Sequence, residues 1–99
     1  MGYENKQTLA PEDFEWLATT LAKVVQSSKM LADIERWLSE RPFVAAVSVL
    51  DHLLKTNPPQ REFLVSFKME DGGSADKLLS IYELDPRRFQ LASLQDRHD

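Results

Sequence analysis

The chain has 99 residues, of which 42% are hydrophobic and 28% are charged, and its formal net charge is −4. This composition is typical of one folded domain and excludes an intrinsically disordered chain. The acidic balance argues against a protein whose main partner is a nucleic acid backbone, because neutralising phosphates requires clustered lysine and arginine. The absence of cysteine excludes disulfides, thiolate metal sites and a cysteine nucleophile.

No stretch of the sequence has the pattern of a sorting or membrane signal. Residues 1–13 lack a basic stretch followed by an apolar one, and no apolar run approaches the roughly 20 residues that a membrane helix needs. We therefore expect a cytoplasmic protein without membrane attachment. We also expect a single α+β domain over residues 1–99, with mobile ends at 1–8 and 95–99.

The first part of the chain predicts two helices. Pro11 suits a first helical position, and apolar residues at helical spacing continue from it to about Gln26. Ser27 and Ser28 then interrupt the pattern, and either could cap a second helix. That helix carries one apolar face, made of Met30, Leu31, Ile34, Trp37 and Leu38. One long helix over residues 11–39 is the alternative, but the apolar face changes phase at the serine pair, which favours two helices.

The most apolar run in the chain, Pro42–Leu54, predicts a third helix. At about 100° per residue its apolar side chains form a wide arc. The remaining polar strip consists of Ser48, Asp51, His52 and Lys55. Pro42 prevents a smooth continuation from the second helix, since proline removes a backbone donor and disfavours helical geometry at the preceding residue. We expect this helix to be buried on more than one side and the rest of the chain to pack around it.

After the proline pair at positions 58 and 59, the period of the apolar residues changes to two. This alternation predicts a strand over residues 63–69 and a return strand over residues 77–84, joined by a turn at Asp71–Ser74 whose glycines permit positive φ. Residues 86–95 suit a strand about as well as a ragged helix, and two arginines at a helix start would oppose the dipole, which favours a third strand. The predicted fold is three N-terminal helices followed by a two- or three-stranded antiparallel meander packed on the third helix.

Few side chains are arranged for chemistry. On the predicted third helix Ser48 and His52 are four residues apart and could meet as nucleophile and base, but Asp51 points about 100° away and orients His52 poorly. A solvated polar strip is the preferred interpretation. His52 and His98 are the only imidazoles and lack metal-ligand spacing, so we expect no metal and no cofactor.

Six residues are candidate contacts with a partner. Trp16 lies opposite the apolar stripe of the first helix, and tryptophan is common at binding hot spots; alternatively, the lead-in or the tail covers it. The arginines of the turn after the return strand could bind an acidic partner or could simply be solvated. Leu64 and Tyr82 are candidates from the second face of the predicted sheet. The complete set of candidate partner contacts is Trp16, Lys23, Leu64, Tyr82, Arg87 and Arg88.

The leading functional hypothesis is a small non-catalytic protein–protein interaction or regulatory module that binds a protein partner or a second copy of itself as a homodimer. A second hypothesis is a winged-helix-like nucleic-acid-binding protein, because the predicted element order is similar to that fold. It is disfavoured, since the third helix offers few side chains that read base edges. A third hypothesis is a small enzyme that uses His52 with Ser48.

Overall fold

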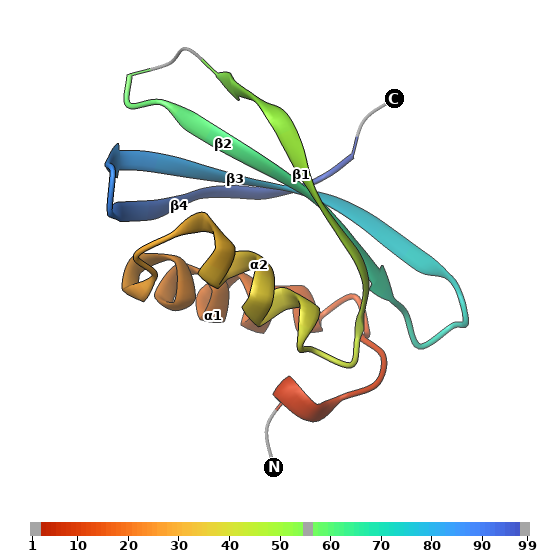
Figure 1. Cartoon of the computed structure of the whole chain (residues 1–99). Helices are drawn as coiled ribbons and strands as arrows, with labels where there is room; N and C mark the ends of the chain where they lie inside the picture. Colours follow the sequence, from red (N-terminus) through yellow and green to blue (C-terminus); the bar gives the residue numbers. More distant parts are fainter. Residues whose placement is uncertain (1–2, 55–56, 98–99) are drawn as a thin grey trace.

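The chain forms two helices that cover one face of a four-stranded antiparallel sheet (Figure 1). The computed structural model describes residues 3–54 and 57–97, with side chains described for 4–50 and 57–97. Strand order follows sequence order, β1-β2-β3-β4. After a short 3₁₀ helix at Tyr3–Asn5, the elements are α1 (Asp13–Ser27), α2 (Leu31–Ser39), β1 (Val44–Leu54), β2 (Gln60–Lys68), β3 (Ser74–Asp85) and β4 (Arg88–Asp96).

The predicted third helix over Pro42–Leu54 is wrong, because this segment is β1. It pairs antiparallel with β2, from Val44 opposite Phe67 to Leu54 opposite Gln60. A short apolar run cannot be assigned by period alone, and the branched valines of this run favour a pleated strand. The α+β class stands. The arrangement is two helices with four strands, and not three helices with a two- or three-stranded meander.

The break between the first two helices is confirmed. Ser28 adopts extended backbone angles, φ −82° and ψ 143°, and ends α1. Neither serine caps α2, because the hydroxyls of Ser27 and Ser28 both donate back to the Val24 carbonyl, at 3.1 and 2.7 Å. The start of α2 is stabilised by the carboxylate of Asp33, which accepts the backbone N–H groups of Lys29 and Met30, both at 3.2 Å.

The hairpin turn and the last strand are also confirmed. Gly72 has φ +90°, a conformation that glycine adopts without strain, and the Asp71 carboxylate accepts the Gly73 N–H at 2.8 Å. The segment after the next turn is β4. Because β4 reaches Asp96, two residues of the tail predicted to be mobile belong to the sheet.

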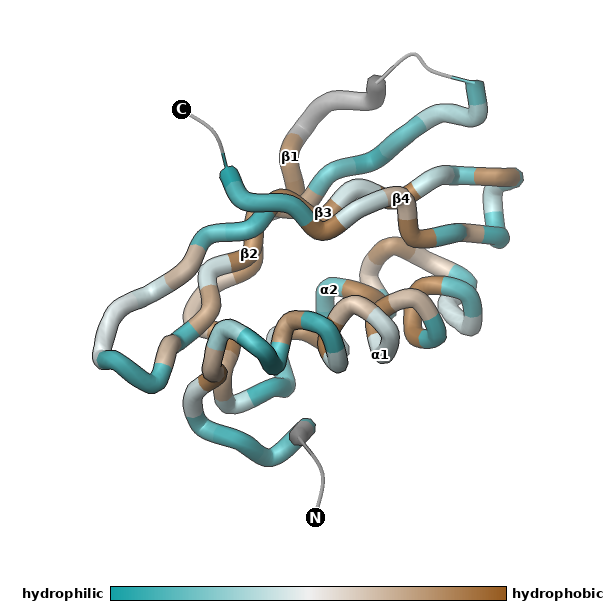
Figure 2. Tube along the Cα trace, turned by 180° about the vertical axis from the view of Figure 1, so that it is seen from behind, coloured by the Kyte–Doolittle hydropathy of each residue, from teal (hydrophilic) through white to brown (hydrophobic). Residues whose placement is uncertain are grey.

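The core lies between the helices and the face of the sheet that they cover, which we call the inner face. Figure 2 shows hydrophobic residues along both helices and through the middle of the sheet. The alternation read in β2 is correct for Phe63, Val65 and Phe67, which are fully buried. The other fully buried side chains are Leu9, Leu17, Leu21, Val25, Ile34, Leu38, Phe43, Leu79 and Ile81.

The N-terminal segment is attached to the β2–β3 hairpin. The Leu9 N–H donates to the Lys68 carbonyl at 2.8 Å, and the Glu70 N–H donates to the Leu9 carbonyl at 2.9 Å. Lys6 lies within the lead-in predicted to be mobile, yet its ammonium nitrogen is 2.6 Å from a carboxylate oxygen of the buried Asp13. These bonds hold the chain ahead of α1 against the sheet.

Candidate functional site

The six predicted partner contacts do not form one site. Trp16 and Lys23 lie on α1, and Arg87 and Arg88 are exposed at the β3–β4 turn. The remaining two, Leu64 and Tyr82, are half-buried on the outer face of the sheet, which the helices do not cover. The structure thus divides these residues among a helix, a turn and a sheet face.

The prediction that Trp16 points away from the core is wrong. Its ring is partly buried and meets Phe43 edge-on, with centroids 6.2 Å apart and planes at 82°. Trp16 is about 100° around the helix from the fully buried Leu17. Its large ring therefore reaches the flank of the core at Phe43.

We expect Trp16→Ala to lower the free energy of unfolding by about 1–3 kcal/mol, because it removes partly buried apolar area and an edge-on aromatic contact. Equilibrium urea denaturation measures this. Lys23→Ala, at an exposed position of the same helix, is the control and should stay within about 0.5 kcal/mol of the unchanged protein. Equal midpoints for the two variants would show that the Trp16 ring adds nothing to the core.

The proposed pairing of Ser48 with His52 loses its geometric basis. Residues four apart meet on a helix, but along a strand they are separated by about 13 Å. Ser48 is exposed on β1, opposite Leu64. The side chain of His52 and the whole of His98 lie outside the described residues. Among the described side chains, no three histidine or acidic groups stand together as a metal site.

A groove of about 530 Å³ runs between α1 and β4. Its one ionisable side chain is Arg88, one of the predicted partner contacts. The guanidinium of Arg88 lies 3.4 Å from a carboxylate oxygen of Asp85, and no acid or base for proton transfer stands among the residues that line the groove. The groove is lined by Ala22, Gln26, Leu84, Arg88, Phe89, Gln90 and Leu91.

β1 forms one edge of the sheet. We call residues Val44–Leu50 the β1 edge; this segment contains no charged residue, and in the described part of the chain β2 is the only strand paired with β1. Four of its side chains are exposed, namely Ala45, Ala46, Ser48 and Val49. Soluble proteins usually protect a free edge with charges or proline, because its unpaired backbone groups attract other strands. The β1 edge has neither a charge nor a proline, although register shifts lie between Val44 and Ala46 and between Val49 and Leu53.

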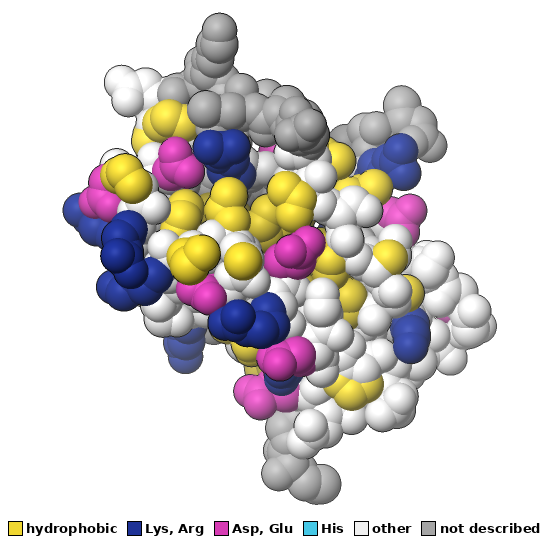
Figure 3. All heavy atoms as spheres, in the orientation of Figure 1, with side chains coloured by type: hydrophobic (Ala, Val, Ile, Leu, Met, Phe, Trp, Pro, Cys, Tyr) yellow, Lys and Arg dark blue, Asp and Glu magenta, His cyan; other side chains and the backbone are white. Residues whose placement is uncertain are grey.

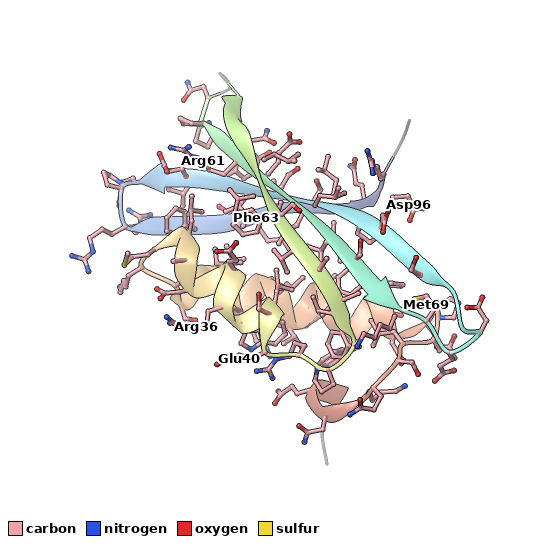
Figure 4. All side chains as sticks on the ribbon, turned by 45° about the vertical axis from the view of Figure 1, so that its right-hand side comes forward. Arg36, Glu40, Arg61, Phe63, Met69 and Asp96 are labelled. Atoms are coloured by element: carbon pink, nitrogen blue, oxygen red, sulfur yellow. The ribbon has the colours of Figure 1, made fainter. Side chains whose placement is uncertain are left out.

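The inner face is uncovered beside the far end of the β1 edge. Val49 pairs with Phe63, so the two side chains share the inner face, yet Val49 is 48% exposed while Phe63 is fully buried. Arg61, two residues before Phe63 on β2, reaches the same face (Figure 4), with its Nε 3.5 Å from a carboxylate oxygen of Glu83. Figure 3 shows hydrophobic side chains at the surface between α2 and the sheet. Apolar surface therefore continues from the β1 edge onto the inner face.

The sequence matches no protein-family model, and no match is found among curated proteins or solved structures. In the described ranges, neither helix is both long enough and apolar enough to cross a membrane. The functional argument therefore depends on the geometry of the β1 edge.

Proposed function

We propose that the protein is a non-catalytic protein–protein interaction module that binds an extended protein segment along the β1 edge. The observation that carries this proposal is a free strand edge without charge over Val44–Leu50. An incoming strand can pair with the outward backbone N–H and C=O groups of such an edge, which supplies affinity with little dependence on side chains.

The uncovered inner face supports the same function. Side chains of an added strand alternate between the two faces of the sheet. Those directed to the inner face would lie beside Val47 and Val49, the first half-buried and the second exposed. The Arg61–Glu83 ion pair lies beyond them on the same face. This combination of backbone pairing and apolar contact is typical of recognition by strand addition.

The competing hypotheses lose their structural support. A winged-helix-like protein needs a helix where this chain has β1, and neither of the two described α-helices takes that place in the element order. An enzyme using Ser48 and His52 needs the helical spacing that a strand does not provide. The interaction module requires neither feature.

A photo-cross-linking amino acid at position 48, in the middle of the β1 edge, tests the proposal in the protein's own host. We expect covalent adducts with protein from position 48 and several-fold fewer from position 90, an exposed position on β4 that serves as the matched control. Mass spectrometry of the adducts identifies what lies against the edge. Equal adduct yields at both positions, or none at position 48, would contradict binding along β1.

A further inference from the structure

We infer that the segment bound along the β1 edge is the β1 edge of a second copy of this chain. The inference rests on the proposed function and specifies its partner. Two four-stranded sheets would join through their β1 strands into one continuous antiparallel sheet. A two-fold axis would relate the copies, as in most homodimers.

The order of residues in the β1 edge suits antiparallel pairing with itself. A two-fold axis at Val47 sets Val47 against Val47 of the second copy. The same axis sets Ala46 against Ser48, and the register shift between Val44 and Ala46 ends the regular correspondence there. Every pair over residues 46–48 joins small or apolar uncharged side chains. The exposed Val49 would lie diagonally beside Val47 of the second copy on the inner face.

Net charge also favours this edge. Each copy carries a formal charge of −4, so two copies repel each other over most of their surfaces. Direct contact through an uncharged segment keeps like charges from facing each other across the strands. The outer face of the sheet, by contrast, carries Glu62 and Asp76.

The opposite edge has a charged residue at each end of β4, with the uncharged residues 89–95 between them. β4 begins at Arg88 and ends at Asp96, and both of these residues already pair with acidic or basic side chains of β3. The β1 edge has no charged side chain in residues 44–50 that an incoming strand would have to displace.

Charge exchange across the axis tests the pairing. We expect the unchanged protein to sediment as a dimer. The variant Ala46→Lys/Ser48→Lys and the variant Ala46→Glu/Ser48→Glu should each dimerise at least about tenfold more weakly, because like charges then face each other twice. An equimolar mixture of the two variants should recover association, since the introduced lysines of one copy would then face the introduced glutamates of the other. As the matched control, Gln90→Lys/Gln95→Lys on β4 should change the dissociation constant of the dimer by no more than about twofold.

A single cysteine provides a second test that does not depend on charged variants folding. The chain has no cysteine, so Val47→Cys introduces the only thiol. Residues facing each other in an antiparallel pair have Cα atoms about 4.5–5.5 Å apart, which a disulfide can span. We expect mild oxidation to yield a covalent dimer from Val47→Cys and little from Gln90→Cys.

The outcomes separate this inference from the proposed function. A monomer at every concentration tested, or charged variants that dimerise like the unchanged protein, would overturn self-pairing. If the pure protein is monomeric while position 48 cross-links to a different protein, the β1 edge is a binding site but its partner is not a second copy. A monomer that gives no adduct from position 48 would overturn both.

Discussion

Phe67→Ala is expected to lower the free energy of unfolding by about 3–5 kcal/mol, measured by equilibrium urea denaturation. Phe67 is fully buried on β2 and lies where α1 and the start of β1 converge. Its ring meets Phe14 edge-on, with centroids 5.4 Å apart, and lies 6.3 Å from the ring of Phe43. Alanine would remove both aromatic contacts and leave a cavity between helix and sheet.

Leu64→Ala provides the control on the same strand. Leu64 faces outward and is half-buried, so its truncation should cost about 1–2 kcal/mol and leave no closed cavity. A loss for Phe67→Ala no larger than that for Leu64→Ala would show that the aromatic contacts are not the centre of the core.

The elements with regular periods and clear boundaries were predictable from the sequence. The stripe of α1 ends at the serine pair, and the alternation of β2 ends at the turn Asp71–Ser74. In both places a change of period coincides with residues that favour a break. Only short-range information is needed for such elements. Their predicted bounds therefore agree with the structure to within a few residues.

β1 was not predictable by the same reasoning. Its apolar residues occupy both faces of the strand, so no period of two appears, and the polar residues after Val47 imitate one strip of a helix. The apolar arc also predicts a helix buried on more than one side. In the structure Val49 is nearly half exposed at the sheet edge. A rule that equates apolar with buried fails where a hydrophobic residue lies on an unprotected surface.

The candidate site was missed because it is made of backbone. Side-chain type points to Trp16, Arg87 and Arg88, but the structure places the tryptophan against the core. Which strand lies at an edge depends on strand order, which arises from long-range pairing. The available signal was the uncharged run Val44–Leu50 with its three branched valines, interpreted as a strand instead of a helix.

The ion pair between Lys6 and Asp13 should make the thermal stability of the protein depend on pH. The hydrogen bond from the Lys6 ammonium, together with the N–H of Ala10 at 2.9 Å, lowers the pKa of Asp13. A carboxyl group whose pKa is lower in the folded state contributes stability above its unfolded pKa. That contribution is lost as the pH falls through the folded value. We therefore expect the thermal midpoint to fall on acidification below the ordinary range of an aspartate.

Asp13→Asn isolates this contribution. Asparagine can still accept the Ala10 N–H, but it has no charge to pair with Lys6. The thermal midpoint of the variant should therefore be several degrees lower at neutral pH. On acidification that midpoint should fall less than the midpoint of the unchanged protein does. At high pH the same contribution to stability is lost as the pH rises. Asp13 raises the pKa of Lys6, so the unchanged protein should retain this contribution until the pH rises through that higher value. Glu12→Gln, at an exposed neighbouring carboxylate, should keep the pH profile of the unchanged protein. If Asp13→Asn had the same profile as Glu12→Gln, the ion pair with Asp13 would not hold the N-terminal segment. Its attachment would then depend on the other contacts, namely the backbone bonds and buried side chain of Leu9 and the contact of Lys6 with Glu70.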